Sequence, residues 1–159
     1  MLSFRNKLTP QDPENIRVIA QSTGFFDEKD TELSADIAQY ILEEGDDEEH
    51  EFIFAEDDDK TVAFACFGMV PDSEASYELY WLSTLNEYRG KGIGKEVIAK
   101  LLNDIKKAGG RKLFLKTCGT DKYAPTRMFY EKCGFKLEGV LKEYYDEDED
   151  CYIYSYKFH

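Results

Sequence analysis

Hydrophobic residues recur at helical spacing in the first part of the chain. Residues 12–24 predict a helix that Asp12 caps and Gly24 ends, and residues 29–45 predict a second helix. A short strand is expected before them, at residues 3–8. The predicted apolar face of the second helix consists of Leu33, Ile37, Tyr40 and Ile41.

Between residues 51 and 85 the pattern changes to that of strands. EFIFAED (51–57) and KTVAFACFGMV (60–70) flank an acidic turn and are typical of a hairpin. SYELYWLSTL (76–85) predicts a third strand, rich in aromatic residues. The next segment, IGKEVIAKLLNDIKKAGG (93–110), returns to helical spacing and ends at a glycine pair.

The last part of the chain combines short strands with one helix. RKLFLKTC (111–118) is a nearly continuous apolar strand, APTRMFYEKCGF (124–135) is a helix, and strands follow at 135–145 and 151–159. The element order is β-α-α-β-β-β-α-β-α-β-β. We therefore expect residues 1–159 to form a single α/β domain around one mixed sheet, in which the strands flanking the third helix run parallel.

Composition and charge narrow the range of partners. Of the 159 residues, 42% are hydrophobic and 14% are aromatic, which is typical of a packed globular protein. The net charge is −13, and acidic residues gather at 46–51, 56–59 and 146–150. Such runs are usually solvated loops, and they argue against nucleic acid as a partner, because binding phosphates needs a basic face. The chain has no run of about 18 apolar residues, so no membrane partner is expected.

Cysteine and histidine usage predicts neither disulfides nor a metal site. Cys66, Cys118, Cys133 and Cys151 form no CxxC motif, and three of them lie in apolar or aromatic strand-like contexts. Buried free thiols in a reducing cytoplasm are the interpretation we prefer, and the N-terminus lacks the apolar segment of a secretory signal. With only two histidines, a serine–histidine–carboxylate triad or a histidine-rich zinc site is not expected.

The segment EYRGKGIGKE (87–96) lies between a strand and a helix. Its glycines permit a tight turn, and the helix N-terminus adds unpaired N–H groups and a partial positive charge. These features favour a phosphate or pyrophosphate site, the alternative being a plain tight turn. The spacing of a P-loop and of the GxGxxG motif is missing, whereas Arg-x-x-Gly-x-Gly fits through Arg89, Gly92 and Gly94.

RGKGIG (89–94) resembles the acyl-CoA pyrophosphate signature of the GNAT superfamily of N-acetyltransferases, and FYEKCGF (129–135) resembles a helix end of that family. The spacing of the two motifs and the element order agree, so the resemblance covers nearly the whole chain. It implies the GNAT fold and a cytoplasmic N-acetyltransferase that uses acetyl-CoA and acts on a primary amine by direct attack in a ternary complex. A GNAT-like module that binds acyl-CoA without turnover is the alternative.

The resemblance also implies which residues hold acetyl-CoA. The backbone at the end of the 76–85 strand would pair with the pantetheine amides, and the glycine turn would hold the pyrophosphate. A splay between the strands at 76–85 and 111–118 would admit the co-substrate, with Thr117 and Cys118 on the channel wall. Tyr123 stands where the family commonly has an asparagine. The implied residues are Leu82, Ser83, Thr84, Arg89, Gly90, Lys91, Gly92, Ile93, Gly94, Lys95, Thr117 and Tyr123.

Glu78 and Tyr130 are the catalytic candidates. Glu78 is a lone charge in an apolar strand, and alternation places it on the same face as Leu82 and Thr84. Its offset from Arg89 resembles that of a catalytic glutamate in some histone-type members of the family, the alternative being an edge or salt-bridged glutamate. Tyr130 resembles the family's tyrosine that faces the CoA sulfur, the alternative being a core aromatic residue.

The acceptor end is the least defined by the sequence. Phe25 and Phe26 connect the first two helices, a connection that covers the acceptor pocket in the resembled fold, and we interpret them equally as pocket wall and as core. The acidic turn 146–150 would lie beside the acceptor entrance. A cationic amine with an apolar body is therefore a candidate acceptor, with solubility as the alternative role of the acid. The sequence leaves the oligomeric state open, a homodimer included.

Overall fold

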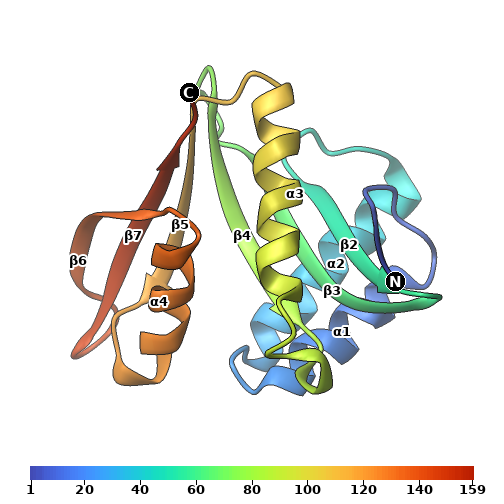
Figure 1. Cartoon of the computed structure of the whole chain (residues 1–159), viewed down its shortest axis with the longest axis horizontal. Helices are drawn as coiled ribbons and strands as arrows, with labels where there is room; N and C mark the ends of the chain where they lie inside the picture. Colours follow the sequence, from blue (N-terminus) through green and yellow to red (C-terminus); the bar gives the residue numbers. More distant parts are fainter.

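A computed structural model describes residues 1–159 as a seven-stranded sheet with helices on both faces (Figure 1). The strands are β1 (Leu2–Arg5), β2 (Glu51–Asp57), β3 (Lys60–Met69), β4 (Ser76–Thr84), β5 (Lys112–Cys118), β6 (Lys136–Asp146) and β7 (Glu149–Lys157). The α-helices are α1 (Asp12–Thr23), α2 (Glu28–Glu44), α3 (Ile93–Lys107) and α4 (Ala124–Lys132), and the 3₁₀ turns are η1 (Asn86–Tyr88) and η2 (Asp121–Tyr123). No helix is both long enough and apolar enough to cross a membrane.

The strands lie in the order β1-β2-β3-β4-β5-β7-β6. Every neighbouring pair is antiparallel except β4 and β5, which are parallel. The predicted α/β fold, its element order and its parallel pair around the third helix are thereby confirmed. The first strand is shorter than predicted, since it covers Leu2–Arg5 rather than residues 3–8.

A separate hydrophobic core lies on each face of the sheet. On one face, Val97 and Leu101 of α3 pack with Leu113 of β5 and with residues of α4. On the other face, Ile16 of α1 packs with Phe54 of β2 and with residues of α2. Burial of β2 and β3 on both faces explains why they are nearly continuous apolar runs in the sequence.

The predicted apolar face of α2 is correct only in part, since Ile37 and Ile41 are partly buried and pack against the core, whereas Leu33 and Tyr40 are exposed. Its buried residues are the small ones, Thr31, Ser34, Ala35 and Ala38. Leu33 and Tyr40 are instead 48% and 54% exposed. Small side chains let the helix axis approach its neighbours closely. The face of α2 that packs against α1 and the sheet therefore carries small residues rather than the largest apolar ones.

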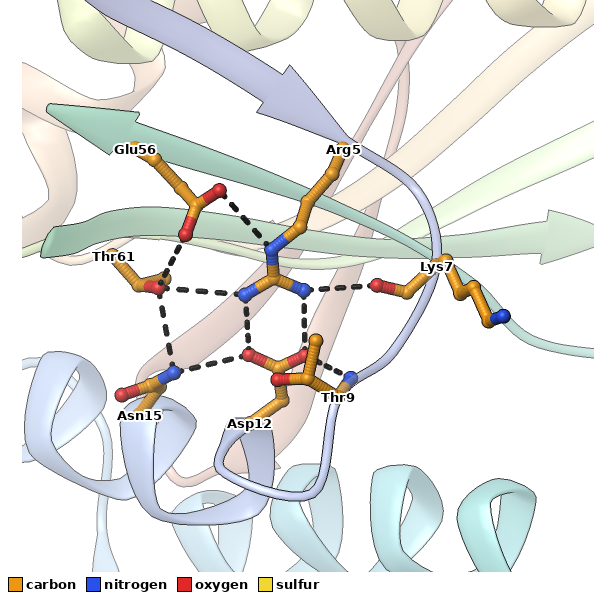
Figure 2. Close-up of polar contacts among 7 residues, drawn as sticks. All are labelled: Arg5, Lys7, Thr9, Asp12, Asn15, Glu56 and Thr61. Carbon is orange, nitrogen blue, oxygen red and sulfur yellow. Dashed lines mark hydrogen bonds and ion pairs between the residues drawn. The ribbon is translucent and has the colours of Figure 1, made fainter. Parts of the chain in front are cut away.

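Asp12 does not cap α1 but lies fully buried in a polar network that joins β1, α1, β2 and β3 (Figure 2). The Arg5 guanidinium donates two hydrogen bonds of 2.7 Å to its carboxylate, and the Thr9 N–H donates a third of 2.7 Å. Arg5 also pairs with Glu56 of β2 at 3.3 Å. Burial would raise the pKa of Asp12, but these bonds together hold it below its ordinary value.

Strand β4 contains a bulge that reverses the direction of its side chains. Leu79 lies opposite Phe67 and Trp81 lies opposite Cys66, so Tyr80 is an extra residue in the ladder. Leu79 packs in the core beneath α3, and Trp81 packs against the core beneath α1 and α2. Before the bulge, odd-numbered residues of β4 therefore face α3, whereas after it odd-numbered residues face α1 and α2.

Candidate functional site

A cleft of about 1000 Å³ lies at the point where the sheet splits. β4 and β5 pair only from Ser76–Leu79 with Lys112–Leu115 and then diverge toward the start of α3 (Figure 1). The last residues of β4 consequently have no strand partner on their β5 side. The splay that was predicted between these strands is present, and it exposes backbone hydrogen-bonding groups to a ligand.

The cleft passes through the split from one face of the sheet to the other. Ile93 and Phe129 line it on the α3–α4 face, and Phe26 and Trp81 line it on the α1–α2 face. The predicted site residues on its wall are Phe25, Phe26, Glu78, Leu82, Ser83, Thr84, Arg89, Gly90, Gly92, Ile93, Gly94, Lys95, Thr117, Tyr123 and Tyr130. Lys91 is the exception, since it does not line the cleft, and its ammonium group lies 5.0 Å from the Tyr88 ring.

The glycine turn presents a row of unused donors at the N-terminus of α3. The N–H groups of residues 90–95 donate to no backbone or side-chain acceptor, and no side chain caps the helix. The Arg89 N–H is engaged, since it donates to the Asn86 carbonyl at 3.2 Å. It therefore does not belong to the predicted set of free amides. Six orphan N–H groups beside the positive end of a helix dipole are an arrangement that favours binding of an anion.

Glycine is required in this turn for two different reasons. Gly90 and Gly92 both have φ +79°, in the left-handed region that favours glycine. Gly94 has ordinary helical geometry, but a Cβ there would lie 3.3 Å from the Phe129 ring. A side chain at Gly92 would meet no atom of the chain within 4 Å, so the space in front of it is open.

Glu78 faces the opposite side of the sheet from Leu82 and Thr84, because the bulge at Tyr80 lies between them. The alternation that placed these three residues on one face was therefore wrong. Glu78 lines the cleft on the α1–α2 side and lies 3.9 Å from the Lys116 ammonium group of β5. Its side chain is 23% exposed, which leaves the carboxylate accessible from the cleft.

Tyr130 lies between the core and the cleft. It is 8% exposed and packs edge-on against Phe129 and Phe135, as a core residue would. Unlike the hydroxyls of Tyr123 and Tyr154, its hydroxyl makes no hydrogen bond within the chain, and the residue lines the cleft wall. Burial raises the pKa of Tyr130 well above its ordinary value, so the hydroxyl keeps its proton at neutral pH.

Tyr123 bonds to the connection between α1 and α2. Its hydroxyl donates to the Phe25 carbonyl at 3.1 Å, and the two rings lie edge to face with centroids 5.4 Å apart. The neighbouring Lys122 ammonium group donates to the Gly24 carbonyl at 3.1 Å. These contacts fix Phe25 on the cleft wall, where the Arg89 guanidinium lies 5.4 Å from its ring.

Charges of opposite sign line different parts of the cleft. Arg89 and Lys95 flank the glycine turn, and Lys132 lies at the end of α4. The carboxylates on the wall are Asp27, Asp30, Glu78 and Glu149. Burial is the main cause of the raised pKa of the Tyr123 hydroxyl, and the nearby Cys118 is the second. Asp30, Glu149 and Asp27 also lie near enough to raise this pKa further. Of the acidic turn 146–150, only Glu149 reaches the cleft.

Sequence reasoning missed several residues of this wall. Lys116 reads as an ordinary strand lysine, and only the register of β4 with β5 reveals that it faces Glu78. Asp30 lies in the first turn of α2, where acidic residues are common for helix stability alone. Phe129 was visible within the FYEKCGF motif, yet its contact with Gly94 depends on how α4 packs beside α3.

Comparison with known proteins gives one family. The family model described as the acetyltransferase (GNAT) family matches residues 14–135. A crystal structure from Desulfovibrio desulfuricans, ascribed to the GNAT family of acetyltransferases, is 36% identical in sequence. It superimposes with a TM-score of 0.96 over 99% of both chains. Among curated proteins, none matches the chain in sequence.

More distant solved structures share the fold. The ribosomal-protein-S18-alanine N-acetyltransferase of Escherichia coli is 20% identical, with a TM-score of 0.77 over 99% of this chain and 94% of its own. An acetyltransferase from Bacillus subtilis, solved in complex with CoA, is 16% identical, with a TM-score of 0.75 over the full length of both chains. At these identities the likeness concerns the fold alone.

Proposed function

The chain belongs to the GNAT family of acetyltransferases, and on that premise we propose that residues 1–159 form one domain that transfers an acetyl group from acetyl-CoA to a primary amine. The observation that carries the proposal is that two groups of backbone atoms without hydrogen-bond partners lie side by side. The unpartnered edge of β4 lies beside the free N–H groups of residues 90–95, at one cleft. Such an arrangement suits a ligand with an amide-containing arm and a pyrophosphate.

The acetyl-CoA site divides between the turn and the strand. The N–H groups of residues 90–95 hold the pyrophosphate, with the Arg89 and Lys95 side chains as counter-charges. The free edge of β4 at Leu82, Ser83 and Thr84 pairs with the pantetheine amides as a further strand would. The bound thioester supplies the activated acetyl group.

Tyr130 acts on the sulfur side of the reaction. Its residue lines the cleft, its hydroxyl is unbonded, and its raised pKa keeps the hydroxyl protonated. It donates a hydrogen bond to the sulfur as negative charge develops there. Because the pKa of Tyr130 lies above that of a thiol, about 8.5, hydrogen-bond stabilisation is favoured over complete proton transfer.

Glu78 acts on the amine side. It lines the cleft on the α1–α2 face, across the sheet from the glycine turn, and lies 3.9 Å from the Lys116 ammonium group. A carboxylate there accepts a proton from the amine, directly or through a water molecule, as the N–C bond forms. An amine that resembles lysine has a pKa of about 10.4, so the attack requires this deprotonation.

A cationic amine with an apolar body suits the acceptor side best. Asp27, Asp30 and Glu149 line this part of the cleft with Glu78 and supply negative charge. Phe25 and Phe26 supply aromatic surface beside them. Positive charge on the acceptor is attracted both by the carboxylates and by the faces of the rings.

A panel of acceptors tests this assignment. Primary amines of positive, zero and negative net charge are offered with acetyl-CoA, and the release of free CoA thiol is followed. We expect the largest kcat/KM for cationic amines that carry an apolar group. Equal or better rates with anionic amines would contradict the acceptor class, whereas CoA binding without thiol release for any amine would favour the module without turnover.

A further inference from the structure

Two of the four cysteines lie directly opposite each other on neighbouring strands. Cys118 is the last residue of β5, and its register partner on β7 is Cys151. The Gly119 N–H donates to the Asp150 carbonyl at 2.9 Å. That bond joins the residue after Cys118 to the residue before Cys151. In an antiparallel ladder this pattern makes the two cysteines a non-hydrogen-bonded pair.

The geometry of such a pair is compatible with a disulfide. Cα atoms of a non-hydrogen-bonded pair lie about 4.5 Å apart, and both side chains stand on the same face of the sheet. Disulfides occur at Cα separations of about 4.4–6.8 Å. Directly opposite Cβ atoms are about 4.5–5.5 Å apart, whereas a disulfide prefers about 3.5–4.5 Å. The Cα separation is thus at the short end of the disulfide range and the Cβ separation at the long end, so the bond requires the two side chains to tilt toward each other and is strained.

The two thiols differ in access. Cys118 is partly exposed and lines the cleft, while Cys151 is completely buried. Tyr145 of β6 lies close to both. Burial raises the pKa of its hydroxyl first, and contact with the Cys151 thiol and proximity to Cys118 raise it further. One accessible thiol beside one buried thiol is the arrangement of an attacking and a resolving cysteine.

We propose that Cys118 and Cys151 are a redox modification site that a low-molecular-weight disulfide converts into a reversible cross-strand disulfide. The Cys118 thiolate attacks the oxidant, forms a mixed disulfide and releases one thiol. The Cys151 thiolate then attacks the Cys118 sulfur and displaces the second thiol. Two protein thiols are oxidised and one oxidant disulfide is reduced to two thiols, so electrons and protons balance. Strained disulfides are the labile ones, so the link is readily reduced again.

The test uses the full chain with oxidised glutathione, followed by alkylation of free thiols and peptide mapping by mass spectrometry. We expect one linked pair of peptides that contains Cys118 and Cys151, with loss of both thiols and their recovery after dithiothreitol. The link forms without acetyl-CoA or an amine, so its absence is distinguishable from a failure of the proposed acetyl transfer.

Single variants separate the two steps. Cys118→Ser should abolish the link, and Cys151→Ser should stop the reaction at a stable glutathione adduct on Cys118. Cys133→Ser is the matched control, since Cys133 is also partly exposed and lines the cleft, and it should link as the wild type does. A wild-type chain that stays unmodified, keeps a glutathione adduct on Cys118, or links Cys118 to Cys133 would overturn the proposal. These readings of the wild type do not depend on whether a variant folds.

Discussion

Tyr130 shows how one residue can satisfy a packing role and still have a free functional group. Its ring is held by Phe129 and Phe135 in the core beneath α3 and α4. Its hydroxyl has no partner in the chain and belongs to the cleft wall. The sequence suggested a core residue or a hydrogen-bond donor as alternatives. In the structure the ring packs in the core, and the hydroxyl is left free to donate a hydrogen bond.

Tyr130→Phe keeps the ring and removes only the hydroxyl. We expect kcat to fall about 10- to 100-fold, because a hydrogen bond to a developing charge is worth about 1.5–3 kcal/mol. The KM for acetyl-CoA should change little, since the bond strengthens only as the sulfur becomes charged. Steady-state kinetics decide, with Tyr156→Phe as a control on the same face. An unchanged kcat would return Tyr130 to a core role.

Gly92 tests the anion site at the same scale. Gly92→Val adds a side chain into open space, where the pyrophosphate is expected, and should weaken CoA binding at least about tenfold. Gly109→Val is the matched control, because Gly109 ends α3 with a similar φ of +85° and also has no atom within 4 Å of a Cβ. Calorimetric titration with CoA on folded protein compares them. Equal affinities in the two variants would remove the glycine turn from the site.

At the scale of elements, regular patterns were predictable from the sequence and their interruptions were not. Periodicity and glycine stops located all four helices and the parallel pair, because these depend on local residue order. The bulge at Tyr80 depends on the register of β3 with β4, and no alternation within β4 reveals it. It moved Glu78 to the other face from Leu82 and Thr84. The same limit applies to α2, whose buried face was set by close packing of small residues.

The network around Asp12 predicts how the first elements respond to substitution and to acid (Figure 2). Asp12→Asn leaves Arg5 without its buried carboxylate and should lower the free energy of unfolding by about 3 kcal/mol at pH 7. The lowered pKa of Asp12 in the folded chain stabilises it above the ordinary pKa near 4. That contribution is lost as pH falls through the folded-state pKa.

Denaturant titration of wild type and Asp12→Asn at pH 7 and pH 3 measures this. The difference between the two proteins should shrink at pH 3, because Asp12 of the unfolded wild type then binds a proton, whereas the lowered pKa opposes this in the folded chain. Asp57→Asn, at a 41% exposed position, is the control and should change stability by less than about 1 kcal/mol. A difference for Asp12→Asn that is the same at both pH values would contradict the role of its charge.

At the scale of the whole molecule, the cleft separates two chemistries across one sheet. Basic groups and free amides flank the start of α3, and carboxylates with aromatic rings lie on the α1–α2 side. The motifs made the first region predictable, because its donors are consecutive in the chain. The second region combines α2, β4 and β7, so its charges come together only in the folded chain.

Salt dependence tests the electrostatic part of this arrangement. For a cationic acceptor, kcat/KM should fall as ionic strength rises to about 0.15 M, where the screening length is about 8 Å. Glu149→Gln should lower kcat/KM at low salt by a few-fold and weaken the dependence. Glu147→Gln removes the same charge from the same turn but lies off the cleft, so it should have the smaller effect. Equal effects of the two changes would show that only the total charge matters.

The most direct measurement of the central claim is the stoichiometry of transfer. Wild type, Tyr130→Phe and Gly92→Val are incubated with acetyl-CoA and the best amine, and both the N-acetylated amine and free CoA thiol are quantified by mass spectrometry. The account predicts one acetylated amine for each thiol released by the wild type, with a lower rate for Tyr130→Phe and a weaker response to acetyl-CoA for Gly92→Val. Thiol release without an acetylated amine, or transfer that both variants perform like the wild type, would contradict it.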